Sequence, residues 1–126
     1  MAAGKHEFYV EQGATFARLL TLTKSDDTPI DLTDHTFRGS IRRLYSDNEV
    51  AAEFEFEKLD QTNEETRGKV KVTISAEDTA GIKVSPAKSP DRKPTEMSYD
   101  IESETASGFV IRWLEGKALI SPEVTR

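Results

Sequence analysis

The chain has 126 residues, of which 36% are hydrophobic and 32% are charged, and its net charge is −6. That length fits a single domain spanning residues 1–126, and the acidic balance argues against nucleic acid as a partner, because nucleic-acid binding favours a basic surface. The absence of cysteine excludes disulfides, thiolate chemistry and cysteine-based zinc sites. No run of about 18 apolar residues is present, so we expect no membrane-spanning segment, and the first residues lack the apolar core of a signal peptide.

Apolar and polar residues alternate along most of the chain, which is the pattern of antiparallel strands with one solvated face. The pattern predicts a short first strand at residues 7–10 and a second strand at residues 15–23. A turn rich in Asp and Pro follows at residues 24–29. The next alternating run, at residues 36–43, predicts a strand that directs its arginines towards water.

Two further strands carry opposite charges. Residues 50–57 form the clearest alternating run in the chain, with phenylalanines on one face and glutamates on the other. Residues 68–75 alternate valine and isoleucine with lysine. If these two strands pair as a hairpin, matching Glu–Lys ladders lie on the exposed face and help to set the register.

A short helix is expected at residues 76–80, because Ser75 can cap its first free N–H groups and Gly81 can end it. The following segment, residues 83–96, holds three prolines and four basic residues and predicts a long exposed loop. Such a loop is either a tolerated insertion or an arm that becomes ordered against a neighbouring chain.

The C-terminal part predicts a strand that begins at Met97, followed by a turn at residues 105–108. Residues 109–121 form either two strands or one bent strand with a bulge at Gly116. Taken together, the pattern predicts an all-β antiparallel sandwich, immunoglobulin-like in architecture, with about seven or eight strands and one short helix. The expected core comprises Phe16, Leu20, Leu22, Ile30, Leu32, Phe37, Ile41, Phe54, Phe56, Val70, Val72, Ile74, Tyr99, Ile101, Leu114 and Ile120.

Residues with catalytic or metal-binding spacing are not found in the sequence. His6 and His35 are the only histidines, and we expect both to be inert surface residues. The glutamates follow strand alternation, which is typical of a solvated face. No nucleophile elbow or phosphate-binding loop is present. We therefore predict no catalytic, cofactor-binding or metal-binding residues, no small-molecule substrate and no enzyme activity.

Two features have a second interpretation as contacts with a partner protein. Trp113 is the only tryptophan, and core packing is favoured over an exposed anchor for a partner. In the 83–96 loop, prolines recur at every fourth position and keep the segment extended. The basic residues Lys88, Arg92 and Lys93 then become candidates for contact with an acidic neighbour.

Several stretches resemble small virion proteins of tailed bacteriophages. They are EQGATF at 11–16, TPIDLT at 28–33, FRGSIR at 37–42, YDIE at 99–102, LEGK at 114–117 and SPEVTR at 121–126. The chain is also similar to the N-terminal β-sandwich of upper baseplate proteins, which attach components of the tail tip. The resemblance covers most of the chain except the 83–96 loop.

The resemblance implies a structural or adaptor component of the virion, associated with the tail or baseplate and assembled in the bacterial cytoplasm. Its partners would be other virion proteins, with several copies arranged around the tail axis. Two alternatives stay open: a host-directed or carbohydrate-binding β-sandwich module, and a decoration protein of the capsid or neck.

Overall fold

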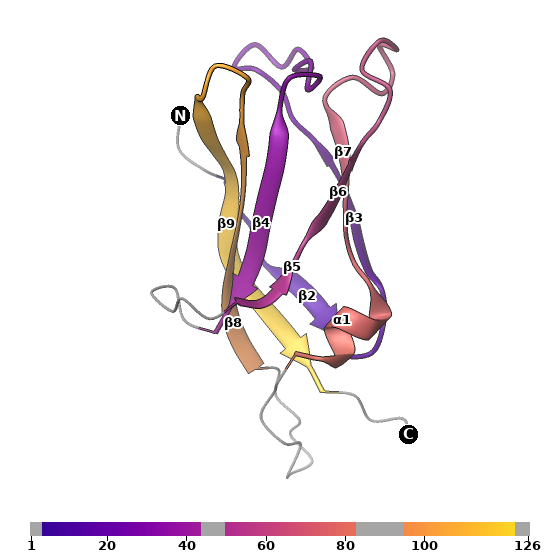
Figure 1. Cartoon of the computed structure of the whole chain (residues 1–126), viewed down its shortest axis with the longest axis vertical. Helices are drawn as coiled ribbons and strands as arrows, with labels where there is room; N and C mark the ends of the chain where they lie inside the picture. The colour runs from indigo at the N-terminus through magenta and orange to yellow at the C-terminus, as the bar shows by residue number, and fades with distance from the viewer. Residues whose placement is uncertain (1–3, 44–49, 83–94, 123–126) are drawn as a thin grey trace.

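A computed structural model describes residues 4–43, 50–82 and 95–122. In these residues, nine strands form two facing sheets, with a single five-residue helix at one end (Figure 1). The predicted antiparallel β-sandwich is confirmed. Sheet A has the order β1-β9-β8-β4-β5, with β2 also paired to β9, and sheet B has the order β3-β7-β6.

Alternation along each strand directs one set of side chains between the sheets and the other set to water. The strands of sheet A are β1 (Gly4–Lys5), β2 (Phe8–Glu11), β4 (Thr36–Arg42), β5 (Val50–Glu53), β8 (Thr95–Glu104) and β9 (Val110–Ser121). Those of sheet B are β3 (Phe16–Thr21), β6 (Glu55–Lys58) and β7 (Lys69–Ile74).

The strands β1 and β2 act as one interrupted edge strand. Both run parallel to β9 with the same offset, since Gly4 lies opposite Leu114 and Phe8 lies opposite Ala118. The first part of the chain therefore completes sheet A beside the last strand, and β3 is left as the end strand of sheet B.

The prediction of one continuous strand at residues 50–57 is wrong. β5 pairs with β4 in sheet A, whereas β6 pairs with β7 in sheet B, and the chain crosses between the sheets at Phe54. The crossing is held by a hydrogen bond of 3.0 Å from the Phe54 N–H to the Gly39 carbonyl. Alternation alone could not reveal the crossing, because Phe54 and Phe56 face the core on both sides of it.

The predicted hairpin of β6 with β7 is confirmed, but its charge ladder is shorter than expected. Glu57 lies opposite Lys71, while Glu55 lies opposite Thr73. One Glu–Lys pair is therefore aligned, and Lys69 is aligned with Thr21 of β3 on its other side.

The last strand is continuous, and its bulge lies at Trp113 instead of Gly116. Ile101 of β8 pairs with Leu114 and the next residue, Glu102, pairs with Arg112, which leaves Trp113 as the extra residue. Gly116 has another role: a Cβ atom there would collide with the His6 carbonyl oxygen where the edge strand passes.

The predicted helix is present as α1 (Ala76–Ala80), with Ser75 as its N-cap and Gly81 as its C-cap. The Ser75 side chain accepts a hydrogen bond of 3.1 Å from the Asp78 N–H. The expected loop ends earlier than predicted, because Thr95 and Glu96 already pair with β9 at the start of β8. Residues 83–94 of that loop lie outside the described residues.

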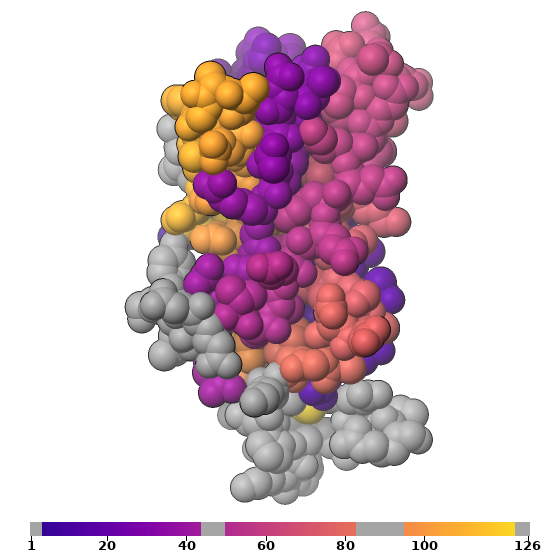
Figure 2. All heavy atoms as spheres, viewed as in Figure 1, coloured from indigo at the N-terminus to yellow at the C-terminus, as the bar shows by residue number. Residues whose placement is uncertain are grey.

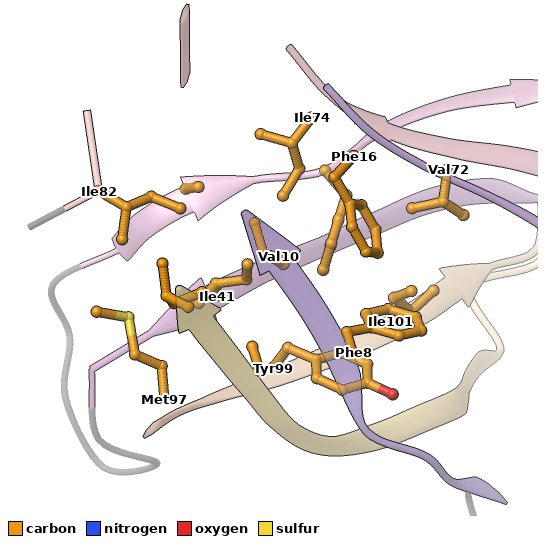
Figure 3. Close-up of a cluster of buried hydrophobic side chains, with 14 residues drawn as sticks. Phe8, Val10, Phe16, Ile41, Val72, Ile74, Ile82, Met97, Tyr99 and Ile101 are labelled. Atoms are coloured by element: carbon orange, nitrogen blue, oxygen red, sulfur yellow. The ribbon is translucent and has the colours of Figure 1, made fainter. Parts of the chain in front are cut away.

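The core consists of two clusters between the sheets, and Figure 3 shows the larger one, in which side chains from both sheets meet. Most of the expected core residues are buried; Leu20, Ile30, Phe37, Phe56 and Leu114 are only partly buried but pack against the clusters. Phe8 was not expected in the core. It is 1% exposed, and its ring stacks on Tyr99 at a centroid distance of 4.2 Å. Val10, Ala52, Ile82, Met97 and Ala118 are further buried residues absent from the list of expected core residues.

Candidate functional site

The outer face of sheet A carries an ordered row of charges. Arg38 of β4 lies opposite Glu102 of β8, which lies opposite Arg112 of β9. Because directly opposed side chains on one face of a sheet are close, the glutamate lies between two arginines. We call this surface the charged face and define it by Arg38, Asp100, Glu102, Glu104, Arg112 and Glu115.

Arg38 makes the shortest contacts on the charged face. Its Nε donates to Glu102 at 2.6 Å and its Nη1 to Glu104 at 2.9 Å. The hydrogen bonds to these carboxylates raise the pKa of the Arg38 guanidinium. Arg112 lies 3.7 Å from Glu102 and 3.8 Å from Asp100. Exposed pairs of this kind contribute about 0–1 kcal/mol each, so the row orders side chains more than it stabilises the fold.

A polar hollow of about 430 Å³ lies beside this face, lined among others by Arg38, Ser40 and Glu53. It exists because β5 pairs only with the Ser40–Arg42 end of β4 before the chain leaves for sheet B. Figure 2 shows the purple β4 segment open to solvent between the orange β8–β9 hairpin and the pink part of the chain. The hollow offers charged and hydroxyl groups to a polar ligand or to a partner surface.

A second open surface follows β3, the end strand of sheet B. Leu19 is 54% exposed, and Ala17 and Thr21 are exposed on the same outer face. The Leu22 N–H donates to the Gly68 carbonyl on the β7 side at 2.7 Å. Since backbone groups alternate along a strand, those of Ala17, Leu19 and Thr21 are directed to the open side.

The surface around Leu19 is hollowed as well as exposed. A shallow hollow of about 490 Å³ is lined by Ala17, Leu19 and Leu59, with charged residues Arg18, Glu57 and Lys71 around it. Arg18 reaches back along its own strand, and its Nη1 donates to the Ala17 carbonyl at 2.7 Å. One outward carbonyl of the edge is therefore covered by a side chain of the same strand. We call Ala17, Leu19 and Thr21, with their outward backbone groups, the β3 edge.

His35 is not a surface histidine, and that expectation is wrong. It is 8% exposed, and its Nδ1 lies 2.9 Å from the Ser103 hydroxyl, which also accepts a hydrogen bond of 2.9 Å from the Trp113 indole N–H. Burial, followed by the nearby Lys58 ammonium, lowers the pKa of the His35 imidazole. The three side chains form a buried polar cluster that joins the 30–35 loop to β8 and β9.

Trp113 belongs to the core, as the favoured interpretation predicted. It is 8% exposed and packs in the smaller cluster with Leu22, Leu32 and Val70. Its ring is therefore used inside the domain and does not present a surface to a partner. The bulge explains this placement, because the extra residue in β9 turns the indole towards the core.

Two polar residues that the sequence did not single out hold the loops at the same end of the sandwich. Gln61 accepts hydrogen bonds from the Leu32 N–H at 2.9 Å and the Gly68 N–H at 3.0 Å. The Lys58 ammonium donates to three carbonyls of the 30–35 loop, including that of His35 at 2.8 Å. Both residues lie in polar stretches, where the pattern gives no sign that their side chains point inward.

Three Asp-x-Thr turns complete these loops. Asp26, Asp31 and Asp60 each accept hydrogen bonds from the backbone N–H and the hydroxyl of the threonine two residues later. These hydrogen bonds lower the pKa of each carboxyl. The carboxylates are thus engaged in local turns.

The described residues hold no group of three or more His, Asp or Glu side chains arranged to bind a metal ion. Within the same residues, no helix has the length and apolar character needed to cross a bilayer. The predicted contact residues Lys88, Arg92 and Lys93 lie outside the described residues.

Neither family models nor curated proteins match this chain. Among solved structures, it is similar to a point mutant of the SrpA adhesin from Streptococcus sanguinis, with 11% identity and a TM-score of 0.50. That match covers 97% of this chain and 56% of the adhesin chain. The sialic-acid-binding region of the Streptococcus sanguinis SK1 adhesin, bound to 3'sLn, matches with 11% identity and a TM-score of 0.45, over 93% of this chain and 28% of that one. The chain thus spans little more than half of the first adhesin, and the likeness to it is one of fold.

Proposed function

We propose that this chain is a non-enzymatic structural or adaptor protein of a tailed-bacteriophage virion, associated with the tail or baseplate. It acts through contacts with other virion proteins, in several copies around the tail axis, after assembly in the bacterial cytoplasm. The proposal combines the sequence resemblance with one structural observation, the β3 edge. A strand edge with exposed apolar side chains and outward backbone groups is suited to being covered by another protein chain.

The basic residues Lys88, Arg92 and Lys93 supply a second proposed contact. On a chain with a net charge of −6, these cations favour an acidic neighbour. Such solvated pairs contribute about 0–1 kcal/mol each, so they orient a contact more than they hold it.

Mass spectrometry of gradient-purified particles tests the proposal. We expect the chain at a constant ratio to known tail proteins across the particle peak, and we expect it to be lost from particles assembled without its gene. Its absence from intact particles, while the tail proteins are present, would reject the virion role. Replacing residues 85–95 by a short Gly-Ser linker tests the loop separately, because normal incorporation of that variant would exclude an assembly role for it.

The polar hollow beside the charged face favours a second candidate, a host-directed carbohydrate-binding module. Its lining of arginine, serine and carboxylate side chains can hydrogen-bond a sugar. Two phenylalanines, Phe37 and Phe54, line it, but Phe54 is buried in the core and Phe37 packs against both core clusters. The exposed aromatic residues Tyr9 and Phe109 do not line it, so no exposed aromatic ring is available there for stacking on a sugar. Titration with sialylated and neutral oligosaccharides checks this candidate: saturable binding that is lost in Arg38→Ala would support it, and no binding at millimolar ligand would reject it.

A further inference from the structure

The edge strands of the two sheets are not equally protected against pairing with another chain. Natural proteins protect sheet edges by keeping them short or by placing charges on them. β2 and β5 are four residues long, and so is β6, three of whose four residues are charged. β3 has six residues, FARLLT, with one charge. Among the edges in the described part of the chain, it is the longest and has the smallest share of charged residues.

We propose that the β3 edge pairs with the β3 edge of a second copy of this chain. The two strands run antiparallel across a two-fold axis perpendicular to sheet B, with Leu19 opposite Leu19 of the second copy. The inference rests on the proposed function, since it names one neighbour of the virion protein as another copy of itself. Each three-stranded sheet B then becomes half of a continuous six-stranded sheet.

The register follows from the alternation of backbone groups and side chains. Because the N–H and C=O of Leu19 are directed to the open side, two copies of Leu19 can exchange both hydrogen bonds across the axis. The same register places Ala17 opposite Thr21 of the second copy, so the outward groups of all three residues find partners. A two-fold contact of this kind is self-complementary, and each pair occurs twice.

The side chains near the axis are compatible with a second copy. Leu19 is flanked within its own sheet by Lys71, so the leucine pair lies between the lysines of the two copies. The lysines are then three strand spacings apart, roughly 14 Å, which is beyond the screening length in physiological salt. The exposed areas around Leu19 merge into one apolar strip across the axis, bordered by Lys71 and Glu57 on each side.

Arg18 determines how readily the edge opens. Its guanidinium now covers the Ala17 carbonyl, and the Thr21 N–H of the second copy has to replace it. The side chain is exposed and held by one such hydrogen bond and by the Phe16 ring, whose centroid lies 4.6 Å from the guanidinium carbon. A six-residue strand pair belongs to the class of small, transient interfaces. Copies held side by side on a particle gain effective concentration, which converts a weak contact into a stable one.

Single cysteines test both the contact and its register, because the natural chain contains none. In the proposed register, Leu19→Cys meets its own symmetry mate at a Cα separation suited to a disulfide. Ala17→Cys does not meet itself but meets Thr21→Cys. Under mild oxidation of the purified full chain, we expect Leu19→Cys to form a disulfide-linked dimer about tenfold faster than Ala17→Cys alone. A mixture of Ala17→Cys and Thr21→Cys should also cross-link rapidly.

Val110→Cys is the matched control, since Val110 is 46% exposed on a strand of sheet A and reports random collisions. A second measurement is sedimentation of the chain without cysteine over a concentration series. The weight-average mass should rise with concentration for the parent and for Val110→Lys. For Leu19→Lys it should stay at the mass of the monomer, because that substitution places two like charges at the axis.

Equal cross-linking rates for Leu19→Cys and Val110→Cys, or a parent that stays monomeric at millimolar concentration, would overturn the proposal. Cross-linking of Ala17→Cys alone at the Leu19→Cys rate would overturn the register. These experiments need no particles. A monomer found in virions would therefore reject the β3 pairing alone, and a β3-paired dimer absent from virions would reject the virion role alone.

Discussion

The hydroxyl of Tyr99 donates a hydrogen bond of 2.6 Å to the backbone carbonyl oxygen of His6. His6 lies in the interruption between β1 and β2, where the edge strand passes closest to Gly116 of β9, the residue paired with Tyr99. One buried side chain from β8 therefore secures the edge strand formed by β1 and β2, which lies on the far side of β9. The contact crosses 93 residues of sequence and fixes the start of the chain beside its end.

Tyr99→Phe should lower the free energy of unfolding by about 1 kcal/mol, because it leaves the His6 carbonyl without its donor and keeps the ring stacked on Phe8. Chemical denaturation measures the change. Tyr9→Phe is the control, since the Tyr9 hydroxyl bonds the exposed Glu7 carboxylate, and we expect almost no effect there. An equal loss in both variants would contradict the role of the His6 contact.

The same tyrosine predicts a pH dependence at the alkaline end. Burial raises the pKa of Tyr99 to about 12 in the folded chain, compared with about 10 when unfolded. The unfolded chain releases this proton first, so the contribution of Tyr99 to stability is complete below about pH 10 and is lost as the pH rises to about 12. Unfolding measured across this range should show a decline that is shallower in Tyr99→Phe. An unchanged slope in the variant would exclude Tyr99 as its source.

Gly116→Ala should destabilise the chain by more than about 2 kcal/mol, because a Cβ atom there collides with the backbone of His6 and cannot be relieved by a rotamer change. The rate of hydrogen exchange at the amides of residues 4–11 should rise in the same variant, because the edge strand separates from β9. Gly81→Ala is the matched control. Gly81 has φ −80° and its added Cβ would make only ordinary contacts, so we expect a change within about 1 kcal/mol.

Gln61→Ala should lower the free energy of unfolding by about 2–4 kcal/mol, since it leaves the buried N–H groups of Leu32 and Gly68 without an acceptor. Thermal and chemical unfolding measure the loss. Asn63→Ala, in the same loop but with an exposed side chain that caps one local turn, should cost about 1 kcal/mol or less. Similar losses for the two variants would show that Gln61 is not the centre of the loop network.

His35 predicts a second pH dependence, near neutrality. Its pKa is lowered by burial and by Lys58, against the opposing charges of Asp34 and Asp31. The unfolded chain takes up this proton first, so the free energy of unfolding should fall as the pH drops below about 6.5 towards the folded pKa. The Asp26, Asp31 and Asp60 carboxyls affect stability only at lower pH, because their pKa values are lowered from ordinary values already near 4.

Denaturation at about pH 7.5 and pH 5.5 should therefore show a smaller difference in His35→Asn than in the parent. His6→Asn is the control, since His6 lies at the edge strand and is exposed. If the stability difference between the two pH values disappears in His6→Asn but persists in His35→Asn, the titration belongs to His6 and this prediction is contradicted.

The fold class, most strand positions and most of the core could be predicted from the residues alone, because a two-residue alternation is a local property and survives in any pairing of the strands. The residues around Phe37 and Ile41, the β6–β7 hairpin and the Ser75 cap could all be predicted on this basis. Each depends on neighbours within a few positions of the chain.

The pairing of the strands could not be predicted in this way. The crossing at Phe54 and the bulge at Trp113 depend on partners far away in sequence, and neither changes the local pattern of apolar residues. The burial of His35 and Gln61 follows from hydrogen bonds made by loops that meet at one end of the sandwich. The open β3 edge also depends on distant partners, because the first strands pair with β9 and not with β3. The packing of both sheets determines this pairing, and the residues of β3 do not indicate it.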